Sequence, residues 1–379
     1  MSGRYGRIPS PHFAAVANPT GSLSVSPTHL ENEYLRVGCE RGGRHRPPLR
    51  PAKQAGTAAC GAIANQWQAF EDRPLYWNAW DIDIFYDDKM WLAEAATAVS
   101  VTETGPLRAT IQIERQILHS RFVQRLSLSH HSPRLDFDTW IDWRERHTLL
   151  KTAFPLDVLS PTATYEIQWG NVERPTHRNT SWDWARFETC AQKWVDLSEG
   201  GYGVSLLNDC KYGHDIQDKT PDGGHIRLTL LRSPTDPDPE ADQGEHTFRY
   251  SLLPHAGRWG AETIRQAYAL NDPLRVYAAG GAAAGEPRAL ASLVAVDAPN
   301  VVIETVKLAE DGQDLIVRLY ECRRQRGEVT VRFGVGVTAV SLTNLLEEPE
   351  TALPHEGSSV TLAIKPYQII TLRVALKSA

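Results

Sequence analysis

The sequence lacks the short motifs on which most enzyme assignments depend. No glycine-rich phosphate loop, nucleophile elbow, His-Glu-x-x-His zinc motif or cysteine cluster occurs in its 379 residues. His214 and Asp215 form an isolated pair in a turn-like stretch, which offers too few ligands for a metal ion. Standard catalytic and metal-binding signatures are therefore missing from this sequence.

The sequence is also poor in features that would indicate a nucleic-acid, membrane or secreted protein. The formal net charge is -6 with both signs mixed, whereas nucleic acids and anionic membranes require a basic face. The five cysteines are odd in number and widely spaced, which is not typical of a disulfide framework. No run of about 20 apolar residues could span a bilayer, and the N-terminus lacks the apolar core of a signal peptide. We expect a soluble, cytoplasmic protein that binds neither nucleic acid nor membrane.

What the sequence does contain is alternation of apolar and polar residues. In RLDFDTWIDW, residues 134–143, the apolar Leu135, Phe137 and Ile141 alternate with aspartates, as in a half-buried strand. Similar segments recur along the chain, and convincing helices are few, the best being RWGAETIRQAYAL at residues 258–270. Many short strands separated by turn residues predict an all-β protein built of antiparallel sandwiches.

Breaks in this pattern predict the domain boundaries. We expect an N-terminal tail at residues 1–21, a large β-sandwich at 22–285 and a small C-terminal β-sandwich at 286–379, because AAGGAAAGEPRALAS is typical of a linker. Residues 38–60 are atypical, since they are rich in Arg, Pro and Gly and have no strand or helix period. A solvated loop, a nucleic-acid arm or a disturbed reading frame would each explain them.

Two segments of the large sandwich combine aromatic rings with charged groups, as sugar-binding sites do. Sugars stack on Trp or Tyr while carboxylates, amides and Arg bind their hydroxyl groups. The candidate substrate-binding or domain-interface residues are Gln66, Glu71, Asp72, Arg73, Trp77, Trp80, Asp81 and Asp83 in the first segment, and Arg174, His177, Trp182, Asp183 and Glu188 in the second. The same residues could instead form a packed core with salt bridges that fix loops, so the residue types alone leave both interpretations open.

Long stretches around these segments resemble a known family. SPTHLENEYLRV at residues 26–37, NQWQAFEDRPLYWNAWDIDIFY at 65–86 and GNVERPTHRNTSWDWARFETC at 170–190 closely resemble the C-terminal half of α-mannosidases of glycoside hydrolase family 38, in the cytosolic-type branch. The resemblance implies a large supersandwich of the galactose mutarotase type followed by a smaller β-sandwich. It also implies retaining hydrolysis of α-mannosides by an Asp nucleophile and a divalent metal, usually zinc, in an N-terminal catalytic domain. No stretch here matches that domain, so the resemblance implies no catalytic residue, no metal site and no cofactor in this chain.

The resemblance predicts that this chain is the C-terminal portion of an α-mannosidase, inactive alone, which completes the active site of a catalytic domain absent from it. The expected partners are that domain and an α-mannoside or oligomannoside, and homo-oligomer formation is left open. The family pattern begins within about two dozen residues of the first residue, which is typical of a fragment of a longer protein. The alternatives are a free-standing carbohydrate-binding module and a mutarotase-like enzyme in which His177 and Glu188 act as acid and base.

Overall fold

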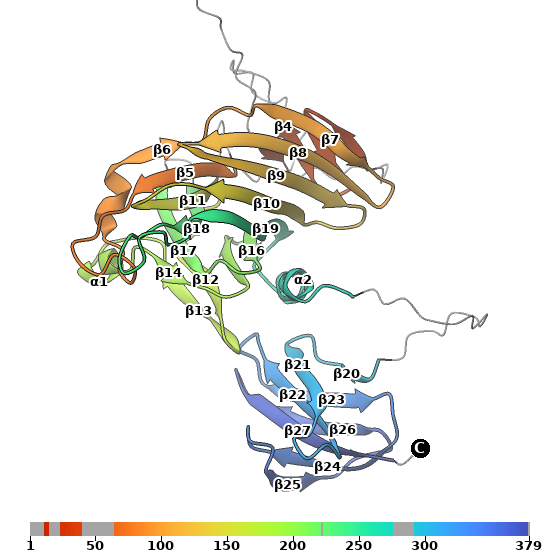
Figure 1. The fold of residues 1–379 in the computed structure, drawn as a ribbon. Helices are drawn as coiled ribbons and strands as arrows, with labels where there is room; N and C mark the ends of the chain where they lie inside the picture. The colour runs from red at the N-terminus through yellow and green to blue at the C-terminus, as the bar shows by residue number, and fades with distance from the viewer. Residues whose placement is uncertain (1–10, 15–22, 40–63, 221–222, 276–291, 378–379) are drawn as a thin grey trace, which may run out of the picture. The chain divides into compact units, whose positions relative to one another are not determined.

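The computed structural model describes residues 11–14, 23–39, 64–220, 223–275 and 292–377. The chain divides into two compact units, the first comprising Met1–Glu166 and Glu173–Pro273 and the second comprising Ile167–Val172 and Leu274–Ala379. The predicted boundary at residues 285 and 286, most of the predicted tail and nearly all of the atypical 38–60 segment lie outside the described residues. The prediction of an all-β sandwich protein is confirmed, because strands form most of both units (Figure 1).

The first unit contains a nine-stranded sheet in the order β13-β12-β15-β16-β19-β10-β9-β8-β7. The alternating segment forms β10, in which Phe137 and Ile141 are fully buried. The strands are β7 (Ala98–Thr104), β8 (Arg108–Ile117), β9 (Ser120–Ser129), β10 (Leu135–Trp143), β12 (Thr162–Ile167), β13 (Gly170–Pro175), β15 (Trp194–Ser198), β16 (Tyr202–Asn208) and β19 (Gly244–Ala256).

A six-stranded sheet in the order β14-β17-β18-β11-β5-β6 faces the nine-stranded sheet across an aromatic core. Trp67 of the six-stranded sheet stacks on Phe122 of β9 with ring centroids 3.8 Å apart, and its indole N–H donates to the Tyr250 hydroxyl at 3.2 Å. The strands are β5 (Gln66–Glu71), β6 (Met90–Leu92), β11 (Thr148–Pro155), β14 (Thr189–Cys190), β17 (Gly213–Thr220) and β18 (Gly223–Arg232). These contacts form the sandwich that the sequence predicts.

Smaller elements complete the first unit. The predicted helix is confirmed as α2 (Ala261–Asn271), which buries Ile264, Ala267 and Leu270. Two short helical segments, η1 (Ile84–Asp88) and α1 (Ser181–Ala185), lie in the two candidate segments. A four-stranded sheet in the order β1-β4-β3-β2 contains β1 (Pro11–Ala14), β2 (Ser24–Ser26), β3 (His29–Glu31) and β4 (Arg36–Cys39).

The second unit consists of two further sheets around an aliphatic core that includes Val317, Leu319, Val331 and Leu372. One sheet has the order β20-β23-β26 and the other β21-β22-β27-β24-β25. The strands are β20 (Val294–Val296), β21 (Val301–Leu308), β22 (Leu315–Glu321), β23 (Gly327–Phe333), β24 (Val337–Thr343), β25 (Pro349–Leu353), β26 (Ser359–Ile364) and β27 (Ile369–Leu376).

The turn between β12 and β13 also belongs to the second unit. The Tyr367 hydroxyl donates to the Asn171 side-chain oxygen at 2.9 Å, and the Asn171 amide donates to the Cys322 carbonyl at 3.0 Å. A Cβ at Gly170 would lie only 2.9 Å from the Tyr367 ring. Glycine at position 170 therefore permits this close approach.

Candidate functional site

The two candidate segments meet over the six-stranded sheet. Phe187, from the second segment, packs against Tyr86 of η1 with ring centroids 6.1 Å apart. Tyr86 in turn packs on Phe70 of β5 and on Leu149 of β11, both buried. This small aromatic cluster fixes the two segments against the same sheet.

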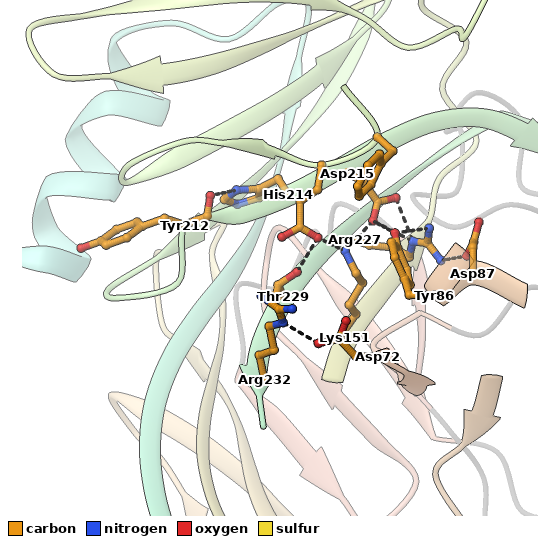
Figure 2. A network of polar contacts seen from close by, with 12 residues as sticks. Asp72, Tyr86, Asp87, Lys151, Tyr212, His214, Asp215, Arg227, Thr229 and Arg232 are labelled. Atoms are coloured by element: carbon orange, nitrogen blue, oxygen red, sulfur yellow. Dashed lines mark hydrogen bonds and ion pairs between the residues drawn. The ribbon is translucent and has the colours of Figure 1, made fainter. Parts of the chain in front are cut away.

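A network of buried ion pairs lies beside this cluster (Figure 2). Lys151 of β11 has no exposed side-chain surface, and its ammonium donates to Glu188 and, at 2.9 Å, to Asp215. Arg227 donates through Nε to Asp215 at 2.8 Å and through Nη1 to Asp87 at 3.0 Å. Asp215 and Arg227 are direct partners in the pairing of β17 with β18, so strand register places these two charges together.

The electrostatics of the network keep its central groups charged. Burial acts to raise the pKa of the Asp215 carboxyl, but the adjacent Lys151 and Arg227 cations outweigh burial and hold that pKa well below its usual range. Burial acts to lower the pKa of Lys151, but the carboxylates of Asp215 and Glu188 outweigh it and raise that pKa. Both groups are therefore ionised at neutral pH, as expected of a structural ion network rather than of a proton donor or acceptor.

His214 lies next to Asp215 in β17. Because side chains alternate between faces along a strand, His214 and Asp215 point to opposite faces of the sheet. Its Nδ1 lies 3.1 Å from the Tyr212 carbonyl, so Nδ1 carries the proton and donates. Burial lowers the pKa of His214 to about 4, so the ring is neutral at physiological pH. Within the described part of the chain, no group of three or more His, Cys, Asp or Glu side chains could hold a metal ion.

The acidic candidates at the end of β5 form ion pairs. Asp72 is buried and pairs with Arg232 of β18, and burial raises the pKa of its carboxyl although Arg232 opposes the shift. Glu71 pairs with Lys89 at 3.0 Å and with Arg73 at 3.6 Å. Arg232 of β18 and Lys89, which directly precedes β6, thus connect the first candidate segment to neighbouring strands.

Three other candidates of the first segment make local hydrogen bonds. Gln66 accepts from the side-chain amide of Gln68 at 2.7 Å in the same strand. Asp83 accepts from the backbone N–H of residue 75 at 2.8 Å, and Asp81 accepts from the backbone N–H of residue 82 at 2.9 Å. Their carboxylates thus order the loop that carries the tryptophans.

The candidate tryptophans of the two segments lie on the surface rather than in the core. Trp77, Trp80 and Trp182 are 72%, 71% and 75% exposed. Trp77 and Trp80 contact each other edge to face, with planes at 80°. The exposed aromatic set, as we call it, also includes Tyr76, Phe85 and Trp184.

Three of the remaining candidates of the second segment lie at a shallow pocket that is open to solvent. Arg174, His177 and Asp183 line it, and the His177 ring lies 3.7 Å from the Asp183 carboxylate. Thr180 caps α1 by accepting from the Asp183 backbone N–H at 3.1 Å. Glu188 accepts from Thr229 at 3.0 Å as well as from Lys151, so His177 and Glu188 have different partners.

Sequence reasoning did not identify Lys151, Asp215 or Arg227, the central residues of the network. One signal was present, because the segment TLLKTAFP of β11 is apolar apart from its lysine and threonines. A lysine in such a strand must be buried, and a buried lysine needs carboxylate partners. The sequence gives no indication of which carboxylates these are, since Glu188 and Asp215 come from distant segments.

Comparison with known proteins gives matches over most of the chain. Residues 30–240 match the glycosyl hydrolases family 38 C-terminal domain, and residues 300–372 match the glycosyl hydrolases family 38 C-terminal beta sandwich domain. Alpha-mannosidase 2C1 of Homo sapiens is 38% identical over 98% of this chain and 37% of its own length. Alpha-mannosidase G of Dictyostelium discoideum is 33% identical over 91% of this chain and 32% of its own length.

A solved structure shares the fold. The alpha-mannosidase from Enterococcus faecalis V583 matches 96% of this chain and 51% of its own chain, with a TM-score of 0.66 and 18% identity. The chain thus spans about a third of the length of these two curated relatives. In the described ranges, no helix is long and apolar enough to cross a membrane. Because the first family model alone covers more than half of its residues, the chain belongs to glycosyl hydrolase family 38 and carries the C-terminal domains of that family.

Proposed function

We propose that this chain is the C-terminal part of an α-mannosidase and that it supports and completes the active site of a catalytic domain that hydrolyses terminal α-mannosides. The names of the relatives support this proposal, since the human and Dictyostelium proteins are both alpha-mannosidases. The nucleophile and the zinc or other divalent metal belong to the catalytic domain in this proposal. The chain alone is then inactive.

The observation that carries the proposal is the exposure of the aromatic set. Trp67, Trp143 and Trp194 are almost completely buried in the sandwich, whereas Trp77 and Trp80 are more than 70% exposed. Large apolar side chains gathered on a surface mark interaction sites, because their exposure to water is unfavourable. The occupant that we assign to this surface is the catalytic domain, since the relatives are about three times as long as the part that this chain matches.

The same exposed tryptophans keep a carbohydrate-binding module as the second candidate function. A sugar could stack on one of the two rings, but the 80° angle between Trp77 and Trp80 gives no flat surface for two consecutive sugars. Titration of the chain with mannose and oligomannosides, read by Trp fluorescence, tests this alternative. Saturable binding at millimolar or lower concentration would favour the module over the docking function.

The docking proposal is tested with a catalytic domain of a family 38 α-mannosidase. Reading the DNA upstream of this chain in all frames tests whether such a domain is encoded there. The chain and that domain are mixed, and release of p-nitrophenol from its α-mannoside is measured with complex formation by sedimentation. We expect activity only in the mixture. The double variant Trp77→Ala, Trp80→Ala should raise the Kd of the complex at least about tenfold, because it removes aromatic anchors from the interface.

The matched control is Leu107→Ala, because Leu107 is 78% exposed between β7 and β8, away from the aromatic set. This variant should form the complex as the unmodified chain does. Robust turnover by the pure chain would contradict the proposed function. Unchanged complex formation by the tryptophan variant would contradict the assignment of the surface.

A cytoplasmic location is part of the same proposal. Cys190, Cys210 and Cys322 are free thiols in the structure, which agrees with a reducing compartment. Cell fractionation with detection of the chain would test the location, and recovery with exported proteins would contradict it.

A further inference from the structure

The pocket beside α1 contains three arginine side chains that the proposed function does not use. Arg174, Arg178 and Arg186 line it, together with the rings of Tyr165 and Phe187. All five residues belong to the first unit. We call this feature the arginine pocket.

Each of the three guanidinium groups is bonded to a backbone carbonyl, and in the described part of the chain none of the three pairs with a carboxylate. The bonds are Arg174 Nη1 to the Cys190 carbonyl at 3.1 Å, Arg178 Nη2 to the Phe187 carbonyl at 3.4 Å and Arg186 Nε to the Trp182 carbonyl at 3.3 Å. A guanidinium group has five N–H donors in a planar fork. The Arg174 guanidinium also lies over the Tyr165 ring at 4.5 Å. Among the described residues, each guanidinium uses one N–H group in a hydrogen bond, which leaves the others for a ligand.

The two carboxylates that line the pocket already have partners of their own. Asp215 is held by Lys151 and Arg227. Asp183 accepts from the hydroxyl of Thr180, at 2.7 Å, and lies near His177. The pocket thus holds more positive charge than its own acidic groups balance.

We propose that the arginine pocket binds a small oxyanion, a phosphate or a carboxylate carried by a compact organic molecule. Guanidinium forks match the geometry of phosphate and carboxylate oxygens and form charge-assisted bonds with them. Phe187 supplies an apolar wall for a carbon skeleton, and the Tyr165 ring, which lies under the Arg174 guanidinium at 4.5 Å, holds that arginine in place. This inference goes beyond the proposed function and does not rest on it, because the isolated chain is sufficient to test it.

Three ligands that share a three-carbon skeleton test the proposal by calorimetry at low ionic strength. Glycerol 3-phosphate carries a phosphate, glycerate carries a carboxylate, and glycerol carries no charge. We expect saturable binding of at least one of the anions with a Kd of about 1 mM or lower and no binding of glycerol. The tighter of the two anions identifies the oxyanion that the pocket selects.

Variants locate the binding. Arg178→Gln and Arg186→Gln should each weaken anion binding about fivefold to tenfold, because each removes a charged donor. The matched control is Arg265→Gln on α2, since Arg265 is exposed and its one ion pair among the described residues is with Glu262. This control should change the affinity less than twofold, and thermal unfolding confirms that each variant is folded.

Other results would overturn the proposal. They are absence of saturable anion binding up to about 10 mM, equal binding of glycerol, or an equal loss of affinity in Arg265→Gln. If Arg178→Gln does not fold, the more exposed Arg186→Gln decides the question.

Discussion

Replacing Lys151 by methionine should destabilise the first unit strongly. The side chain is fully buried and is the direct partner of both Glu188 and Asp215. Methionine fills a similar volume but removes the charge. The buried Asp215 and the partly exposed Glu188 then lose their shared cation, although Asp215 keeps Arg227. Removal of one partner from a buried ion pair costs about 3–5 kcal/mol, and we expect the free energy of unfolding to fall by that amount.

The measurement is urea unfolding followed by Trp fluorescence. All eleven tryptophans except Trp169 lie in the first unit, so the signal reports mainly on that unit. Glu188→Gln should lower the free energy of unfolding by only about 1–2 kcal/mol. The glutamine side chain can still accept from Thr229, and this position has some contact with solvent. The double variant should lose less than the sum of the single changes, by about 1–3 kcal/mol.

Lys89→Met is the matched control, since Lys89 also pairs with a glutamate, at 3.0 Å, but is 55% exposed. A surface pair of this kind contributes at most about 1 kcal/mol. If Lys151→Met lost no more stability than Lys89→Met, the reasoning about the buried network would be refuted.

Two further predictions concern pH and packing. The pKa of His214 is about 4 in the folded chain, against about 6.5 when unfolded. The unfolded state therefore binds more protons between these values, and stability should fall by up to about 3 kcal/mol as pH is lowered from about 6.5 to about 4. His214→Gln should flatten this dependence in urea titrations at several pH values, and an unchanged slope would contradict it. Trp67→Ala should cost about 3–5 kcal/mol because it empties part of the core, whereas Trp77→Ala should change stability by at most about 0.5 kcal/mol. Thermal unfolding compares the two, and equal losses would contradict the burial difference.

The sequence identified the architecture because strand formation follows from local patterns. The alternating residues of β10 and the period of α2 specify which faces are buried, and the structure confirms both elements. The long motifs around residues 65–86 and 170–190 resembled glycoside hydrolase family 38, and the comparisons place the chain in that family. Such motifs can be recognised without any knowledge of tertiary contacts.

The residue types of the candidate segments did not distinguish core from surface. Trp67 and Trp77 are ten positions apart in the same motif, yet one is buried against Phe122 and the other is exposed. Burial depends on which sheet faces the side chain, and no local period encodes that in an irregular loop.

Local sequence patterns are enough to predict the all-β class and the family, since both depend on short segments. That Lys151, Glu188 and Asp215 form one network, and that three arginines share a pocket, became visible only in the folded chain. Those groups come from separate strands and loops, and the pairing of β11, β17 and β18 brings them together. The physical reason is that a charge can be buried only where a partner lies within a few ångströms, and long-range strand pairing determines where that partner lies.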